Sequence, residues 1–235
     1  HHKCAGRANW GKSKKTLARI AQAQKGINLN FDVYPYTASA TALMPDRLSI
    51  AEKILVVSSD SFPDKAGQYL KDIASDWNLT QVESAEKLSP AQAIYFAMDE
   101  EDVQRVLSHE KAMIGSDGIP GTDAPHPRLW GTFPRVLGHY SRNLGLFDLE
   151  TAVHKMTGLT AGVFGFADRG VLRKGAIADI TVFNPEIIID RASFKKPTQE
   201  AYGIMYVIVG GELILESGLQ NHARPGKVVT RETCF

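Results

Sequence analysis

The nine residues AMIGSDGIP, numbered 112 to 120, run from a short apolar stretch directly into a polar turn that contains one carboxylate. The apolar start predicts a strand over 112–116, which places Asp117 at the strand's carboxyl end. In barrels of parallel strands and helices, catalytic groups occupy that end of the strands. Asp and Gly are also common turn residues, so the stretch taken alone equally fits an ordinary turn.

Three other stretches favour a site over an ordinary turn. His126-Pro127-Arg128 lies on a Pro-rich segment without helical or strand periodicity, which predicts a lid or wall. Residues 30–36, NFDVYPY, form a second strand-to-loop junction crowded with polar and aromatic groups, and the chain opens on His1-His2-Lys3. We therefore expect several polar groups to meet at one edge of the fold.

Composition excludes several classes of function. With 235 residues, 43% hydrophobic and 23% charged, the chain is typical globular material for one barrel-sized domain or two smaller ones. The 27 basic and 26 acidic residues are interspersed and give a net charge of +1, so no nucleic-acid partner is expected. No run approaches the roughly 18 apolar residues of a membrane span, so no membrane partner is expected either.

The two cysteines, Cys4 and Cys234, lie near opposite ends and form neither a disulfide framework nor a CxxC zinc motif. This usage favours a reducing compartment, and we predict a cytoplasmic location. The chain begins on His1 without an initiator Met. We interpret it as the C-terminal piece of a longer protein.

The first half of the chain predicts alternating helices and strands. An amphipathic helix ends at Gly26, and a strand over 27–34 is closed by Pro35. Residues 45–90 differ in sequence pattern from the residues around them, and we interpret them as an inserted lid segment. Further predicted elements are a strand at 54–57, a helix at 64–77, a helix at 91–98 started by Ser89-Pro90, and a helix at 100–107 capped by Asp99.

The second half predicts helices followed by a β-rich region. The predicted helices cover 132–143, 149–156 and 160–166, and Arg128 is placed on the loop before the first of them. From about residue 170 the spacing of apolar residues changes from helical to strand-like. A strand is predicted over 175–185, and a strong hairpin over 204–209 and 212–216 around Gly210-Gly211.

Seven motifs together resemble the C-terminal part of the amidohydrolase superfamily, and in particular its N-acyl-D-amino-acid deacylase branch. Glycine 175 through Val182 fits a signature of the whole superfamily, whereas Tyr34-Pro35-Tyr36 and residues 126–131, HPRLWG, are specific to the deacylase branch. The Tyr34-Pro35-Tyr36 motif belongs to a longer matching stretch, 32–36, and the other matching stretches are 1–4, 93–100, 115–118 and 155–157. The resemblance covers nearly the whole chain in order and spacing.

The resemblance implies an α/β fold, the C-terminal portion of a (β/α)8 barrel plus a small β-sandwich domain. Residues 1–169 would supply barrel strands six to eight with the inserted lid segment at about 45–90, and residues 170–235 the small β-rich domain. It also implies the site: His1 and Asp117 as metal ligands and Asp117 as the catalytic acid and base. Lys3, Tyr34 and Arg128 would hold the substrate's carboxylate.

Other polar residues are not assigned to the site. Cys4 does not match the family's ligating cysteine, and His2 is taken as a bystander. Without the resemblance, His1 would more often be an exposed or hydrogen-bonded histidine, and Lys3 and Arg128 two surface cations. The remaining histidines are expected to be structural or exposed: His109, His126, His139, His154 and His222.

The implied activity is zinc-dependent hydrolysis of the amide bond of N-acyl-D-amino acids, which releases a carboxylate and a D-amino acid. Zinc lowers the pKa of a bound water to about 7, and an unactivated amide needs the hydroxide nucleophile that results. Asp117 would accept the water's proton and return it to the departing nitrogen. Two alternatives stay open: a cyclic amidase of the hydantoinase or dihydroorotase type, and an inactive, non-catalytic fragment.

Overall fold

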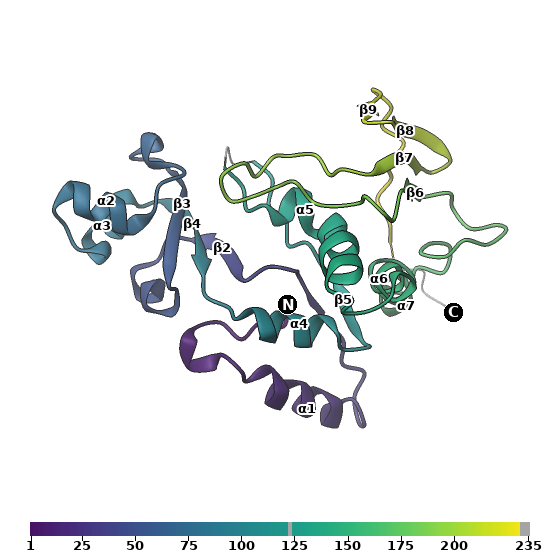
Figure 1. Ribbon diagram of the computed structural model, residues 1–235, viewed down its shortest axis with the longest axis horizontal. Helices are drawn as coiled ribbons and strands as arrows, with labels where there is room; N and C mark the ends of the chain where they lie inside the picture. The colour runs from purple at the N-terminus through teal and green to yellow at the C-terminus, as the bar shows by residue number, and fades with distance from the viewer. Residues whose placement is uncertain (122–123, 231–235) are drawn as a thin grey trace.

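The computed structural model describes residues 1–121 and 124–230, and Cys234 lies outside these ranges. Figure 1 shows helices and strands mixed along the chain, with a sheet of the C-terminal region at one end of the molecule. The fold is therefore α/β, as predicted. Within the described residues, no helix is both long and apolar enough to cross a membrane.

Two short parallel strands form the part of the fold that carries the site. β1 (Phe31–Val33) pairs with β5 (Ala112–Ile114), and Val33 lies opposite Ile114. Since the strands are parallel, their carboxyl ends meet at one edge. Helix α4 (Glu100–Leu107) precedes β5 and is capped by Asp99, as predicted.

Helix α1 (Ser13–Ala23) confirms the first predicted helix. The strand after it is shorter than the predicted 27–34. The Leu29 amide donates to the carbonyl of Ile27, and the Gln24 side chain donates to the carbonyl of Leu29. These bonds fold residues 27–30 into a turn, so β1 begins only at Phe31.

A three-stranded antiparallel sheet stands beside this pair, with the order β2-β4-β3. Its strands are β2 (Ala38–Ala42), β3 (Lys53–Ser59) and β4 (Ala91–Phe96). The predicted strand at 54–57 lies inside β3, whereas the predicted helix at 91–98 is wrong. Ala93 and Tyr95 pack into one hydrophobic cluster and Ile94 into another, so β4 is buried on both faces. Such a strand lacks the polar alternation that distinguishes strand from helix.

The predicted single helix at 64–77 is also wrong at its start. A 3-10 turn, η3 (Pro63–Lys65), comes first, and the helix proper, α2, spans Leu70–Trp77. Between them Gly67 has φ +82°, and its amide donates to the carbonyl of Val56. This segment therefore runs against β3 before the helix begins. The remaining elements here are η1 (Arg7–Asn9), η2 (Pro45–Ile50) and α3 (Gln81–Leu88).

Helix α5 (Arg128–Arg135) begins earlier than the predicted residue 132, which corrects the placement of Arg128 on a loop. The backbone amide of Arg128 donates to Nδ1 of His126 at 3.0 Å, and this bond satisfies one of the free amides of the helix's first turn. A π-helical stretch, η4 (Val136–Asn143), continues α5. The predicted 149–156 and 160–166 helices are α6 (Leu149–Met156) and α7 (Gly158–Phe164).

The C-terminal region forms a four-stranded antiparallel sheet in sequence order. Its strands are β6 (Ile180–Phe183), β7 (Ile204–Val209), β8 (Glu212–Glu216) and β9 (Leu219–Gln220). The predicted hairpin is confirmed in both strands. β6 is shorter than the predicted 175–185, because residues before it turn back: the amide of Ile177 donates to the carbonyl of Asp168.

The main hydrophobic cluster joins the two halves of the chain. It contains Val33 and Ile114 of the parallel pair, Tyr140 of η4, and Ile188 from the segment between β6 and β7. Ile188 is 1% exposed. Part of the C-terminal region therefore packs into the same core that supports the strand ends carrying the site.

Candidate active site

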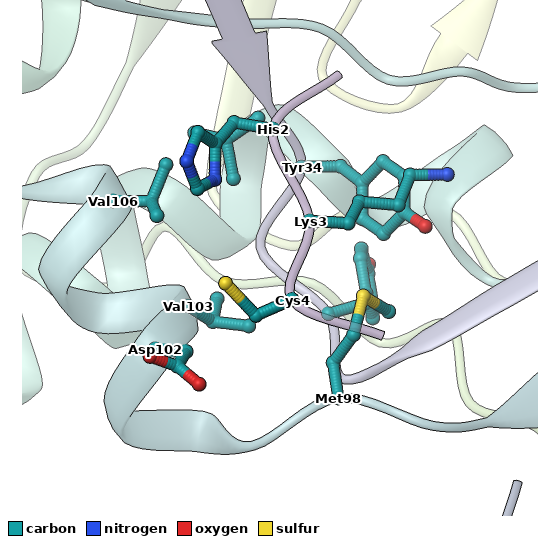
Figure 2. A pocket seen from close by; sticks show the side chains of 10 residues that line it. His2, Lys3, Cys4, Tyr34, Met98, Asp102, Val103 and Val106 are labelled. Carbon is teal, nitrogen blue, oxygen red and sulfur yellow. The ribbon is translucent and has the colours of Figure 1, made fainter. Parts of the chain in front are cut away.

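The first four residues run extended beside β1, where the amide of His2 donates to the carbonyl of Asp32 at 2.8 Å. Side chains of an extended segment alternate between two sides. Figure 2 shows the result: Lys3 points toward Tyr34, while His2 and Cys4 point the other way, toward α4. His2 bonds Thr16 through Nε2 at 2.8 Å, and burial raises the pKa of the Cys4 thiol.

A small cavity lies beneath this segment, against α4 (Figure 2). Its lining is mostly apolar: His2, Lys3, Cys4, Val33, Tyr34, Tyr36, Met98, Asp102, Val103 and Val106. Cys4 thus lies in the interior, on the side of the segment away from Lys3. This placement agrees with leaving Cys4 out of the ligand set.

Asp117 follows β5 in a left-handed backbone conformation, with φ +49°. Asp is one of the few residue types other than Gly that adopt this conformation with some frequency, and such residues gather at functional sites. Two residues earlier, Gly115 has no side chain to fill the space beside it. A Cβ there would collide with the carboxylate of Asp32, so glycine lets the two strand ends approach each other.

The imidazole of His1 lies between two carboxylates. Its Nδ1 is 2.6 Å from Oδ2 of Asp32, and its Nε2 is 3.2 Å from Oδ1 of Asp117. A carboxylate that accepts the Nδ1 proton fixes the ring's tautomer and leaves the Nε2 lone pair free. Asp32 therefore orients His1 so that the free nitrogen faces Asp117.

Arg128 is 1% exposed, and its Nη2 lies 2.9 Å from Oδ2 of Asp117. Its Nε and Nη1 are buried and have no hydrogen-bond partner among the residues that the structure describes. Buried polar groups are almost always paired, so unpaired guanidinium donors at a strand end indicate a place for an absent acceptor. Among the residues that the structure describes, Arg128 thus has one carboxylate partner and two nitrogens without a partner.

Tyr34 lies next to these free donors. Its ring is 4.9 Å from Cζ of Arg128 and also 4.9 Å from Nζ of Lys3, and it meets the His1 ring edge-on. Within the described chain its buried hydroxyl has no hydrogen-bond partner, and burial raises its pKa. Desolvation lowers the pKa of Lys3, partly offset by the charge of Asp117. Three elements thus bring donors to one place.

The structure brings together every residue predicted for the site: His1, Lys3, Tyr34, Asp117 and Arg128. The sequence predictions gave no role to Asp32. A carboxylate between Phe31 and Val33 in an apolar strand nevertheless indicated a functional position. His126 was expected to be structural or exposed, and the structure confirms the first. His126 is 4% exposed and bonds the carbonyl of Ala38 through Nε2 at 3.1 Å, so it is a structural residue.

The donor set suits zinc in part. Imidazole nitrogen and carboxylate oxygen are common zinc ligands, and Nε2 of His1 and Oδ1 of Asp117 face each other. A zinc site needs at least three protein donors. In residues 1–121 and 124–230, no group of three His, Cys, Asp or Glu side chains is arranged to hold a metal. His1 and Asp117 are therefore two candidate ligands, short of the three that a zinc site needs.

Comparison with known proteins gives a consistent result. The sequence model of the amidohydrolase family matches residues 73–215. A D-aminoacylase from Alcaligenes xylosoxydans xylosoxydans is 46% identical over 231 residues, which are 98% of this chain and 48% of that protein. The chain thus spans about half the length of the curated relatives it matches.

Two solved structures are similar over nearly the whole chain. A crystal structure of D-aminoacylase, 48% identical, matches with a TM-score of 0.95 and covers 98% of this chain and 49% of its own. The N-acyl-D-glutamate deacylase of Bordetella bronchiseptica, 46% identical, matches with a TM-score of 0.92 over 99% of this chain and 49% of its own. That enzyme was solved with zinc and a phosphonate inhibitor that mimics the tetrahedral intermediate of its reaction.

Proposed function

The chain belongs to the amidohydrolase family, and we propose that the protein it forms part of hydrolyses the amide bond of N-acyl-D-amino acids with zinc as cofactor. The products are a carboxylate and a D-amino acid. We also propose that residues 1–169 belong to a (β/α)8 barrel, with Lys3, Tyr34 and Asp117 at the ends of strands six, seven and eight. The parallel pairing of β1 with β5 supports this arrangement.

One observation carries the proposal of substrate class: within residues 1–121 and 124–230, the buried Nε and Nη1 of Arg128 and the nearby buried hydroxyl of Tyr34 have no hydrogen-bond partner. A planar guanidinium donates two parallel hydrogen bonds to a carboxylate from one edge, Nη2 together with either Nε or Nη1, and Lys3 adds a second positive charge. Nη2 carries two hydrogens, so the one that Asp117 does not accept can complete such an edge. We call Lys3, Tyr34 and Arg128 the carboxylate clamp. An N-acyl amino acid presents this carboxylate one carbon from its amide nitrogen.

The neighbouring residues supply the chemistry of amide cleavage. His1 and Asp117 would hold zinc with ligands from the rest of the protein, and bound zinc supplies a Lewis acid and lowers the pKa of water. Asp117 is placed to accept a proton from the attacking water and to return it to the amide nitrogen. Asp32 keeps the His1 ring in the orientation that points Nε2 toward Asp117.

Holding the carboxylate also gives a physical basis for preferring one enantiomer. When the carboxylate and the scissile amide are both fixed, the remaining two substituents of the α-carbon can exchange places only by inverting that carbon. The wall around the clamp then accepts a side chain on one face. Nucleic acids and membranes play no part in this proposal, and the cytoplasmic location stays a prediction.

The test is a substrate panel with the full-length, zinc-loaded protein. It compares N-acetyl-D-amino acids and their L enantiomers with hydantoin and dihydroorotate. We expect hydrolysis of the D acids, loss of activity after removal of zinc by a chelator, and recovery when zinc is returned. Cleavage of the cyclic amides with no turnover of the N-acetyl-D-amino acids would assign the protein to the cyclic amidases instead.

A further inference from the structure

A segment from the C-terminal region lies along one face of the helix that carries Arg128. The face consists of Gly131, Arg135, Gly138 and Arg142, whose spacing of four, three and four residues lines up on a helix. The segment is residues 185–190, between β6 and β7. A Cβ on Gly138 would collide with the carbonyl of Ile188, so glycine permits this close contact.

The two arginines of this face hold the segment at its two ends. Arg142 donates from Nη1 to the carbonyls of Pro185 and Ile188, at 3.1 and 2.7 Å. Arg135 pairs through Nη1 with Oδ2 of Asp190 at 3.3 Å, and the side chain of Asp190 is 6% exposed. Asp190 is thus a buried carboxylate brought to the helix from the C-terminal region.

Arg135 also reaches the loop that carries Tyr34. Its Nε donates to the carbonyl of Pro35 at 2.9 Å, and its Cζ lies 5.2 Å from the ring of Tyr36. The hydroxyl of Tyr36 is 3.5 Å from the carbonyl of Pro127, the residue before Arg128. The contacts therefore form a continuous path from Asp190 through Arg135 to the loop that carries Tyr34, and through Tyr36 to the residue before Arg128.

Arg128 and Arg135 are seven residues apart on one helix and lie over the two tyrosines of Tyr34-Pro35-Tyr36. Their remaining contacts differ. Arg135 bonds the Pro35 carbonyl and the Asp190 carboxylate, whereas Nε and Nη1 of Arg128 have no partner in the described part of the chain. Arg135 thus holds the loop through contacts within the protein, and Arg128 faces the place where a ligand carboxylate fits.

We propose that Asp190 is a positioning residue for substrate recognition: by holding Arg135, it fixes the Tyr34-Pro35-Tyr36 loop and the start of α5, and thereby the geometry of the carboxylate clamp. This inference rests on the proposed function. A buried ion pair adds little net stability compared with an apolar pair, so its effect lies in holding partners in one arrangement. Carboxylate recognition then depends on the C-terminal region as well as on the strand ends.

The experiment measures, in the full-length zinc-loaded enzyme, the ratio of kcat/KM for N-acetyl-D-methionine to that for its carboxamide. Asp190→Asn keeps the volume but removes the charge that holds Arg135. We expect the ratio to fall by roughly 10-fold, mainly through a higher KM for the acid, as is common for residues that orient a binding group. If this variant does not fold, Arg135→Lys is measured with the same expectation.

Arg142→Met is the matched control, because Arg142 holds the same segment to the same helix but does not touch the Tyr34 loop. It should lower Tm and leave the ratio unchanged. In an Arg128→Met background, Asp190→Asn should cause no further fall in the ratio, since its effect acts through the clamp.

Three results would overturn the inference. The first is an unchanged ratio in the folded Asp190→Asn or Arg135→Lys variant, while the parent prefers the acid. The second is an equal fall in Arg142→Met, which would assign the effect to general support of the helix. A parent with no preference for the acid would overturn the proposed clamp, and this inference with it.

Discussion

Asp117 lies between an imidazole and a guanidinium, 3.2 Å from Nε2 of His1 and 2.9 Å from Nη2 of Arg128. In the full-length enzyme, Asp117→Asn keeps the volume but removes the proton acceptor. We expect kcat to fall by at least about 100-fold, the lower range for acid–base catalysis. The apparent substrate affinity should change much less.

The zinc content of the Asp117→Asn variant is the control for this measurement. A variant that keeps its zinc and loses kcat has lost the proton acceptor, whereas a zinc-free variant has lost a ligand. Near-parental kcat in the zinc-loaded variant would contradict the assignment of Asp117 to proton transfer.

His126 shows how one buried side chain can set the position of another. Its Nδ1 accepts a hydrogen bond from the backbone amide of Arg128, and its Nε2 donates one to the carbonyl of Ala38. The neutral ring is therefore fixed in one tautomer. Burial and the charge of Arg128 lower its pKa to about 3. The ring is therefore neutral throughout the physiological range.

Two substitutions of His126 separate these bonds. Asn can place an oxygen near the position of Nδ1 and keep the bond to the Arg128 amide, while Gln can place its amide nitrogen near Nε2 and keep the bond to Ala38. A buried hydrogen bond contributes about 1 kcal/mol, so we expect His126→Gln to lower kcat/KM for the acid roughly fivefold more than His126→Asn. Equal values for the two variants would show that the bond to Arg128 does not matter.

At the residue scale the sequence was sufficient for some assignments and not for others. Asp117, Tyr34 and Arg128 follow from strand-end placement together with the family motifs, and the structure brings them together. Asp32 lies in the matching stretch 32–36 but was given no role, because a motif does not show which other side chain a carboxylate orients. Its role depends on Gly115 leaving room for it, a contact between strands about 80 residues apart in sequence.

Helix α6 is joined to β5 by a buried lysine. Lys155 is 1% exposed, and its Nζ donates to the carbonyls of His109 and Ala112 just before and at the start of β5. Burial lowers the pKa of Lys155 to about 8, against 10.5 for the ordinary side chain. Below pH 8 the lysine is charged in both the folded and the unfolded state.

Between about pH 8 and 10.5 the folded protein releases this proton while the unfolded chain keeps it. The unfolded state then binds more protons, so the free energy of unfolding rises with pH. We expect a gain of about 1–3 kcal/mol across this window relative to Lys155→Met, which cannot titrate. Urea unfolding of the parent and of Lys155→Met, both full-length, at pH 7.5 and 10 measures this gain. The same change in the free energy of unfolding between the two pH values in both proteins would contradict the assignment.

Element by element, the strongest predictions came from local signals. The hairpin around Gly210-Gly211 and the helix capped by Asp99 were predicted correctly, since turn and capping residues act over a few positions. Residues 91–96 were predicted as helix because an apolar run buried on both faces has no distinctive period. Only pairing with β2 and β3 makes it a strand, and those partners are distant in sequence.

On the scale of the whole molecule, the described residues contain two of the ligands proposed for zinc. His1 and Asp117 face each other, but no third ligand completes a group within residues 1–121 and 124–230. β1 and β5 form only a two-stranded parallel sheet, whereas parallel sheets are stable when several strands are covered on both faces. The isolated chain should therefore bind zinc weakly and lack deacylase activity.

Metal analysis of the isolated 235-residue chain beside the full-length protein tests this expectation. We expect less than stoichiometric zinc in the isolated chain after dialysis, and full occupancy in the complete protein. One tightly bound zinc per isolated chain, or turnover of an N-acetyl-D-amino acid by it, would show that the described residues suffice.

We propose that Arg128 recognises the substrate's carboxylate through two parallel donors on one edge of its guanidinium. The most direct measurement is kcat/KM for N-acetyl-D-methionine and for its carboxamide, in the full-length enzyme and in Arg128→Lys. Lysine keeps the charge but lacks the two parallel donors. We predict a 10- to 100-fold lower value for the acid in the variant, about 1.4–2.8 kcal/mol, and little change for the carboxamide. Equal rates on the acid in both proteins, or equal rates on acid and carboxamide in the parent, would contradict the claim.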